Sequence, residues 1–337
     1  MSAPDERRRA GTAQPAQPRR DLVGAGLVLA AASFFATLGP LAAFATRAGV
    51  SSLALVTWRA ALGALCVVLA LGVWRALGHS VPVTRLRTLP ARDRWSMGGA
   101  AVANTILNLS VFIAFTRIGI TLSLLIFYLY PALVALASVT WFGDRLDGLR
   151  WSALAMSMVG IVLVVAGAGQ IGELDVLGMG LAFVGALGQT FYVMAARHGF
   201  ARVPGAQAAF LTMAGAAAIY VVLAVLFAQA GTLLQPLDSA AAFWPVLLAG
   251  VIGAGAPTFL YITGIRRLGA PRAAILSTFE PVVGVALATV LLGERPGPLQ
   301  LVGGALIVAA AITLQLRPHA EMAEHEAYVE TDTALSS

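Results

Sequence analysis

The chain has 337 residues, of which 59% are hydrophobic and 11% are charged, with a formal net charge of +6. Soluble domains carry about 25% charged residues, so this composition excludes an ordinary soluble domain and predicts an all-α integral membrane protein. All 22 basic residues are arginine and gather beside apolar segments, where they orient membrane helices, so we expect no nucleic-acid partner.

The chain divides into ten apolar runs between two polar tails. Residues 1–21 are rich in Arg, Pro, Ala and Gln and hold almost no large apolar residue, which predicts a disordered basic tail. The acidic residues 317–337 predict a second one. Runs of about 17–25 apolar residues cross a bilayer. They cover 22–46, 52–74, 96–115, 119–142, 151–168, 176–195, 206–229, 243–264, 270–292 and 299–316, with a tight turn at 117–119 between the third and the fourth.

The second half of the chain repeats the first. Arg, Gly, Pro and Leu residues near the span ends and helix breaks recur at one offset of 150 positions. The residues that start each half match at an offset of 154. The pairs are Arg117 and Arg267, Gly119 and Gly269, Pro131 and Pro281, Gly143 and Gly293, Arg145 and Arg295, Leu149 and Leu299, and Asp21 and Asp175. This pattern indicates an internal duplication, with repeats at 22–168 and 176–316. Five spans per repeat is an odd number, so the repeats are inverted, which places a substrate site near the bilayer midplane.

The arginines between the spans predict the orientation. With a cytoplasmic N-terminus, eighteen arginines lie inside, three lie outside, and Arg59 lies within a span. Because cytoplasmic loops carry the excess of basic residues, we expect both termini in the cytoplasm. The use of arginine without lysine, together with abundant Ala, Leu and Gly, indicates a GC-rich bacterial genome and hence a bacterial inner membrane.

One acidic residue, Glu280, lies in the middle of the ninth run. A charged residue at the bilayer centre costs about 2.5–3.5 kcal/mol, so it is normally kept for a function and faces the bundle interior. Pro281 follows it and predicts a helix break at the same depth, because proline lacks a backbone N–H. Pro131 predicts the matching break in the first repeat, where Tyr130 replaces Glu280. Glu280 either carries a coupling proton or only ties down the distorted helix by accepting hydrogen bonds.

Amide side chains mark two further spans as candidate cavity walls. Asn104 and Asn108 are four residues apart and share one face of the third span, where they can bind a carboxylate, an amine or a base edge. Gln189 and Tyr192 are three apart and share a face of the sixth span. The alternative for the asparagines is interhelical hydrogen bonding, which contributes about 0.6 kcal/mol.

Tyrosines and one arginine complete the set of candidate residues. Tyr130 and Tyr261, with Tyr192, can cage a cationic or planar substrate, or they pack with their hydroxyls satisfied by neighbours. Arg59 lies seven residues into the second span, about 10 Å from its outer end at 1.5 Å per residue. It either extends to the outer interface or pairs with a substrate carboxylate or with Glu280.

Two matching segments resemble a known family. Each has a proline in the fourth span of its repeat, followed by a Gly-acid-Arg corner. They are Tyr128-Leu129-Tyr130-Pro131 with Gly143-Asp144-Arg145-Leu146, and Phe279-Glu280-Pro281-Val282 with Gly293-Glu294-Arg295-Pro296. This pattern is similar to that of the EamA-type transporters of the drug/metabolite transporter superfamily and covers residues 22–316. Asp144 replaces the more usual Glu, and Pro296 replaces a small apolar residue or Leu, both away from the midplane. The resemblance implies a central cavity lined by the first, third, fourth, sixth, eighth and ninth helices.

The resemblance implies a secondary transporter that exports a small metabolite, such as an amino acid or amine, by alternating access, with proton antiport through Glu280. Passive facilitators and importers share the fold and stay open as alternatives. A membrane enzyme needs clustered chemistry, whereas His79 and His198 are isolated in loops. No catalytic residue, metal or cofactor is expected. The implied partners are the substrate, protons and bilayer lipid, and a homodimer is compatible with this interpretation.

Overall fold

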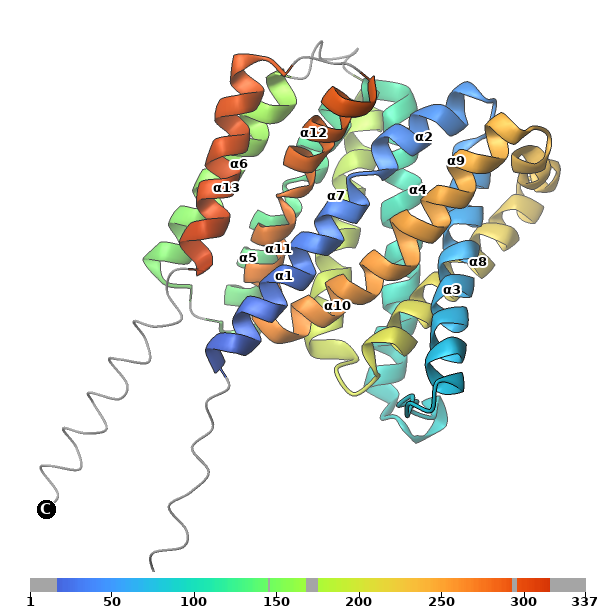
Figure 1. The fold of residues 1–337 in the computed structure, drawn as a ribbon, viewed down its shortest axis with the longest axis horizontal. Helices are drawn as coiled ribbons and strands as arrows, with labels where there is room; N and C mark the ends of the chain where they lie inside the picture. The colour runs from blue at the N-terminus through green and yellow to red at the C-terminus, as the bar shows by residue number, and fades with distance from the viewer. Residues whose placement is uncertain (1–16, 145, 168–174, 293–295, 316–337) are drawn as a thin grey trace, which may run out of the picture.

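The computed structural model describes residues 17–144, 146–167, 175–292 and 296–315. Every regular element in these residues is a helix, as the sequence predicts (Figure 1). Nine segments are long and apolar enough to cross a membrane, and the shorter apolar helix Pro298–Thr313 supplies the tenth span. Most of the two predicted tails lies outside the described residues. The first helix begins at Gln17.

The first repeat contains six helices and one 3₁₀ turn. They are α1 (Gln17–Phe35), α2 (Leu38–Arg47), α3 (Ser52–Ala76), η2 (Leu86–Thr88), α4 (Ala91–Phe127), α5 (Tyr130–Phe142) and α6 (Gly148–Gly167). The second repeat contains α7 (Val176–Met194), η3 (Ala195–Gly199), α8 (Gly205–Leu226), η4 (Ala230–Leu237), α9 (Ala240–Gly250), η5 (Val251–Gly255), α10 (Ala256–Leu268), α11 (Ala270–Ser277), α12 (Glu280–Leu292) and α13 (Pro298–Gln315). Both η3 and η5 are π-helical.

Polar side chains and glycine set the helix ends. Ser51, Asp175 and Ser239 accept hydrogen bonds from backbone N–H groups in the first turns of α3, α7 and α9, which satisfies donors that have no partner within the helix. Gly143 ends α5 at φ 70°, a left-handed conformation that glycine adopts without steric cost. These local signals place the corners of the bundle.

The chain reverses direction within α4. We expected a tight turn at 117–119, but the backbone there is helical and α4 continues to Phe127. A straight helix would separate Val111 and Phe127 by about 24 Å, yet a Cβ on Gly185 would lie 2.5 Å from Val111 Cγ2 and 3.7 Å from Phe127 Cδ2. The third and fourth spans are therefore antiparallel neighbours, joined by a bend that keeps helical backbone geometry.

The first span is broken, which the apolar run did not predict. α1 ends at Phe35 and α2 begins at Leu38. Pro40 follows four residues after Ala36, and a proline ring clashes with the carbonyl one turn earlier in a helix. The Thr37 hydroxyl donates to the Phe34 carbonyl at 2.7 Å and so satisfies one of the acceptors at the end of α1.

Helix pairing follows the duplication. α1 packs against α10 and α11, and its counterpart α7 packs against α4 and α5. The pairs α3 with α8, α5 with α11, and α6 with α13 each join corresponding spans of the two repeats. The pair α6 and α13 lies at one edge of the bundle, and the start of α1 lies at the same end of the bundle as the end of α13 (Figure 1). Exchanging the two repeats preserves this set of contacts.

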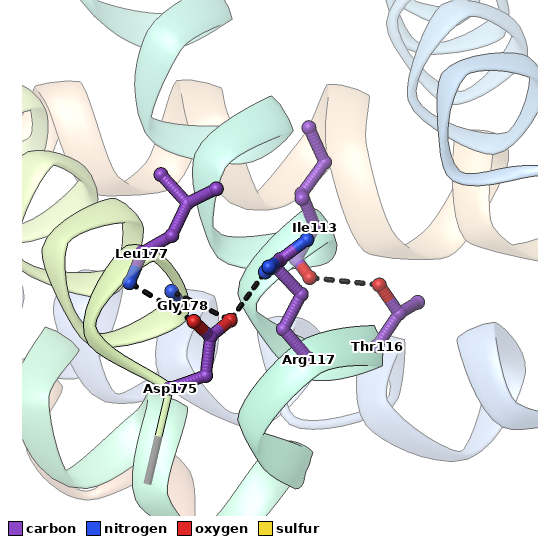
Figure 2. Close-up of polar contacts among 6 residues, drawn as sticks. All are labelled: Ile113, Thr116, Arg117, Asp175, Leu177 and Gly178. Atoms are coloured by element: carbon purple, nitrogen blue, oxygen red, sulfur yellow. Dashed lines mark hydrogen bonds and ion pairs between the residues drawn. The ribbon is translucent and has the colours of Figure 1, made fainter.

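Two ion pairs tie the first span of each repeat to the corner of the other repeat. Asp21 contacts Arg272 at 3.0 Å. Asp175, which occupies the equivalent position, accepts from Arg117 Nε and from the backbone N–H groups of Leu177 and Gly178 (Figure 2). Arg117 lowers the pKa of the Asp175 carboxyl below its ordinary value. Because the repeats are inverted, the two ion pairs lie at opposite ends of the bundle.

Glycines let the helices of the two repeats approach closely. A Cβ on Gly303 of α13 would lie 2.5 Å from the Gly160 carbonyl oxygen and 2.7 Å from Val164 N in α6. A Cβ on Gly188 of α7 would lie 3.1 Å from the Ala103 carbonyl oxygen in α4. Lipid gives helices no hydrophobic reason to associate, so close backbone packing between small residues supplies much of the attraction.

We predict that Gly303→Ala destabilises the bundle and that Gly304→Ala, one residue on, does not. The Cβ that the first substitution adds would collide with backbone atoms of α6. Overpacking of this kind costs about 1–3 kcal/mol. A Cβ on Gly304 would meet the Val282 side chain at ordinary contact distances, 3.8 Å from Cγ1 and 4.0 Å from Cγ2. Thermal unfolding of the two purified variants in detergent measures the difference, and equal midpoints would contradict this account of the contact.

Candidate functional site: a cavity between the two repeats

A cavity of about 540 Å³ lies between the two repeats. All eight polar side chains that the sequence predicts for the site line it, although they come from six different spans. They are Arg59 on α3, Asn104 and Asn108 on α4, Tyr130 on α5, Gln189 and Tyr192 on α7, Tyr261 on α10 and Glu280 on α12. The expected set of helices leaves out three spans that also line the cavity: the second through Arg59, the fifth through Val164 and Val165, and the tenth through Gln300.

The two predicted helix breaks lie side by side at the cavity. α4 ends at Phe127 and α5 begins at Tyr130; α11 ends at Ser277 and α12 begins at Glu280. Each proline occupies the second position of the following helix, where its missing N–H leaves no helical hydrogen bond unmade. Pro281 lines the cavity, whereas Pro131 is buried in the core. Glu280 thereby lies in the first turn of α12, where the helix dipole favours a negative charge.

An arginine and two asparagines form one wall of the cavity. Arg59 Nη1 donates to Asn108 Oδ1 at 2.5 Å, and Asn108 Nδ2 donates to the Asn104 carbonyl and Oδ1 at 2.8 and 3.0 Å. The guanidinium thus turns toward the third span and does not extend to the outer interface, which was one of the two expectations. Arg59 Nε is buried and has no hydrogen-bond partner.

Glu280 and Tyr128 line the same cavity, and the Tyr128 hydroxyl lies near the Glu280 carboxyl group. Arg59 and Glu280 influence one another electrostatically, but they are not joined by an ion pair within 4.0 Å. Sequence reasoning missed Tyr128. The signal was present, since it lies two residues before Tyr130 at the same helix break.

Buried tyrosines form the floor of the cavity. Tyr130 hydrogen-bonds with Ser277 across the repeats, and Ser277 Oγ itself donates to the Ala274 carbonyl at 2.7 Å, so Tyr130 is the donor. The hydroxyls of Tyr192 and Tyr261 are buried without a hydrogen bond of ordinary geometry. The Tyr261 hydroxyl lies near Tyr130, Ser277 and Gln189, which leaves polar atoms at the floor able to bind a ligand.

The cavity extends toward one end of the bundle. Its lining includes Thr289 on α12, Pro296 and Gln300 near the start of α13, and five residues of α2: Leu38, Gly39, Pro40, Ala43 and Arg47. None of its lining residues comes from the first two turns of α1 or from α11 before Ser277. The opening therefore lies at the end of the bundle opposite to the start of α1, and the tyrosine floor closes the other end.

Comparison with known proteins identifies this arrangement. A family model described as the EamA-like transporter family matches the chain twice, over residues 22–166 and 176–315. The chain belongs to the EamA-like transporter family. It is therefore a multi-pass membrane protein, and the ten-helix fold with two inverted repeats is confirmed.

Individual relatives of this EamA-like transporter are distant. An uncharacterized transporter of Synechocystis sp. is 24% identical over 203 residues, which are 59% of this chain and 59% of that protein. The chain thus spans less than two thirds of the length of this relative. One solved crystal structure is similar with a TM-score of 0.71 and 22% identity, covering 89% of this chain and 98% of the other. At this identity the likeness shows the fold alone.

The opening of the cavity can be tested by labelling. In a Cys66→Ser background, we expect Thr289→Cys at the cavity mouth to react with a membrane-impermeant thiol reagent added outside spheroplasts. Val102→Cys, on a residue 47% exposed on the outer surface of α4, lies in hydrocarbon and should stay unlabelled, because thiolates do not form in an apolar environment. Labelling of Thr289→Cys only from the cytoplasmic side would contradict the assigned orientation of the cavity.

Proposed function

We propose that this EamA-like chain is a secondary transporter of the bacterial inner membrane that exports a small metabolite by alternating access, with both termini in the cytoplasm. The observation that carries the proposal is the central cavity, which holds Glu280 at the interface of two inverted repeats and opens toward one end of the bundle. Rocking of the repeats would close this end and open the other. The arginine distribution and the shared end of α1 and α13 support the orientation.

The lining of the cavity favours a small polar or amphipathic substrate, such as an amino acid or a related amine. It combines amides, tyrosine hydroxyls and two opposite charges with phenylalanine rings. A few placed polar groups in a mainly apolar pocket are the usual composition of a small-molecule site. Export is the proposed direction, since the outward-opening cavity is the form from which an exported substrate leaves.

Glu280 is the proposed coupling residue. A carboxyl group in an apolar environment favours its protonated form, so a cationic group of the substrate and a proton compete for it. A proton that enters from outside would displace the substrate, and release of that proton to the cytoplasm would reset the site. The Tyr128 hydroxyl lies near this carboxyl group and would orient it by a hydrogen bond in either state.

The first test is export by living cells. Untargeted mass spectrometry of medium and cell extract compares hosts that express the wild type, Glu280→Gln or Asp238→Asn at equal membrane abundance. Asp238 is exposed next to η4 and provides the same change of carboxyl to amide outside the cavity. We expect one metabolite enriched in the medium with the wild type and Asp238→Asn, and about tenfold to hundredfold less with Glu280→Gln. Hydrogen bonds to charged groups contribute about 1.5–3 kcal/mol, which corresponds to that range.

The second test separates antiport from passive flux. In proteoliposomes loaded with the exported metabolite, an imposed proton gradient should drive wild-type flux in the direction opposite to the protons, and Glu280→Gln should lose this response. A passive facilitator would give flux that ignores the gradient and tolerates the substitution. Uptake from the medium in place of release would instead identify an importer.

A further inference from the structure

A groove of about 510 Å³ lies between the end of α2 and the first two turns of α9. These two helices lie side by side, one from each repeat (Figure 1). The lining of the groove includes Phe44 and Arg47 on α2 and Ala241, Trp244 and Pro245 on α9. The side chains of Phe44 and Trp244 are 40% and 57% exposed, so the groove opens on the outer surface of the bundle.

The groove lies at the depth of lipid headgroups. Arg47 ends one membrane-crossing segment, and Ala240 begins another. Trp244 lies four residues into α9, about 6 Å at 1.5 Å per residue, and tryptophan gathers at this level of a bilayer. The ring of Phe243 meets the indole edge-on, with centroids 5.5 Å apart and planes at 71°, which orients the indole. Phospholipid headgroups and the first carbons of their acyl chains are therefore the groups that reach this groove in a membrane.

Arg47 gives the groove a positive charge. It is the only charged side chain among the described residues of the lining, and it forms no ion pair with a carboxylate of the described chain. Asp238, the acidic residue nearest to α9 in the sequence, is exposed and lies outside the lining. A guanidinium binds a phosphate through parallel N–H donors, so Arg47 is available to a lipid phosphate.

Pro245 removes a helical hydrogen bond at the groove. Proline has no backbone N–H, so the Ala241 carbonyl, four residues earlier, lacks the donor that an unbroken helix supplies. Ala241 and Pro245 both line the groove. A headgroup that carries a hydroxyl can donate to this carbonyl, whereas an acyl chain cannot.

An amphipathic anion matches all of these features. A soluble anion would pair with Arg47 but would gain nothing from Phe44 and Trp244. A neutral apolar molecule would cover the two rings and desolvate an unpaired charge, which is costly. A zwitterionic phospholipid has a phosphate but also brings an ammonium group close to the guanidinium. An anionic phospholipid with a glycerol headgroup offers a phosphate, hydroxyl donors and acyl chains without that repulsion.

We propose that the groove between α2 and α9 binds an anionic phospholipid, with its phosphate on Arg47, its headgroup hydroxyls toward the Ala241 carbonyl and an acyl chain over Phe44 and Trp244. Arg47 also lines the mouth of the central cavity, but the other groups that bind the lipid do not. Because α2 and α9 belong to different repeats, the lipid joins the two repeats at this end of the bundle. The inference goes beyond the proposed transport function and does not depend on it.

Quenching of Trp244 fluorescence by brominated lipids tests the site on the full chain. The protein is reconstituted in phosphatidylcholine vesicles with rising fractions of phosphatidylglycerol or phosphatidylethanolamine that carry bromine on their acyl chains. The Trp244 signal is the difference between the wild type and Trp244→Phe. We expect half-maximal quenching at about fivefold less phosphatidylglycerol than phosphatidylethanolamine, because one arginine near a membrane surface favours an anionic lipid by about this factor.

Two arginine variants then assign the preference. Arg47→Gln should make the two lipids equally effective. Arg75→Gln is the matched control, since Arg75 is an exposed arginine beside Trp74 at the other end of the bundle, and it should keep the preference of the wild type. Each variant is compared with the same variant that also carries Trp244→Phe, so that the Trp244 signal is isolated every time.

Three results would overturn the proposal. Equal quenching by the two lipids in the wild type would show that the groove does not select an anionic headgroup. An unchanged preference in Arg47→Gln would show that the selection arises elsewhere. Relief of the quenching by soluble glycerol phosphate would show that the site takes the free anion in place of the lipid.

Discussion

The hydrocarbon core of a bilayer offers no hydrogen-bond partners, so polar groups within the spans have to be satisfied inside the protein. Here this requirement links the spans to one another. Arg59 on the second span is held by Asn108 on the third, and Tyr130 on the fourth hydrogen-bonds with Ser277 on the ninth. The second of these bonds joins the two repeats. The side chains that form the cavity therefore also hold the centre of the bundle together.

Other contacts between the repeats are held differently. Where α6 meets α13 and where α4 meets α7, glycines allow backbones to touch, and interdigitated atoms supply the attraction. Such contacts have one good geometry and resist sliding. The cavity, with its hydrogen bonds and an open volume, can exchange partners at lower cost.

Much of this organisation is readable in the sequence because membranes simplify the problem. The required length of an apolar run marks the spans, and the recurrence of Arg, Gly and Pro at one offset reveals the duplication. Polar residues inside spans are rare, so Asn104, Asn108 and Glu280 can be recognised as candidate site residues from the sequence. The structure brings all eight predicted polar side chains to one cavity.

What escaped prediction depends on side-chain direction and local backbone geometry. The position of Arg59 in the second span allowed both an interfacial and an interior guanidinium, and only its contact with Asn108 distinguishes them. The break at residues 36–37 was hidden because α1 and α2 form one continuous apolar run. Gly119 suggested a turn, but the backbone of the bend within α4 is helical. Helical hydrogen bonds can be kept through a bend, and the spacing of residues in the sequence does not show whether they are.

The break in the first span has a consequence for energetics. If the two repeats were identical, the outward-open and inward-open forms would be symmetry mates of equal free energy. The residue equivalent to Ala36 in the second repeat is Thr190, which lies inside the uninterrupted helix α7. The two forms are therefore not symmetry mates, and symmetry does not hold their free energies equal before any substrate or proton binds.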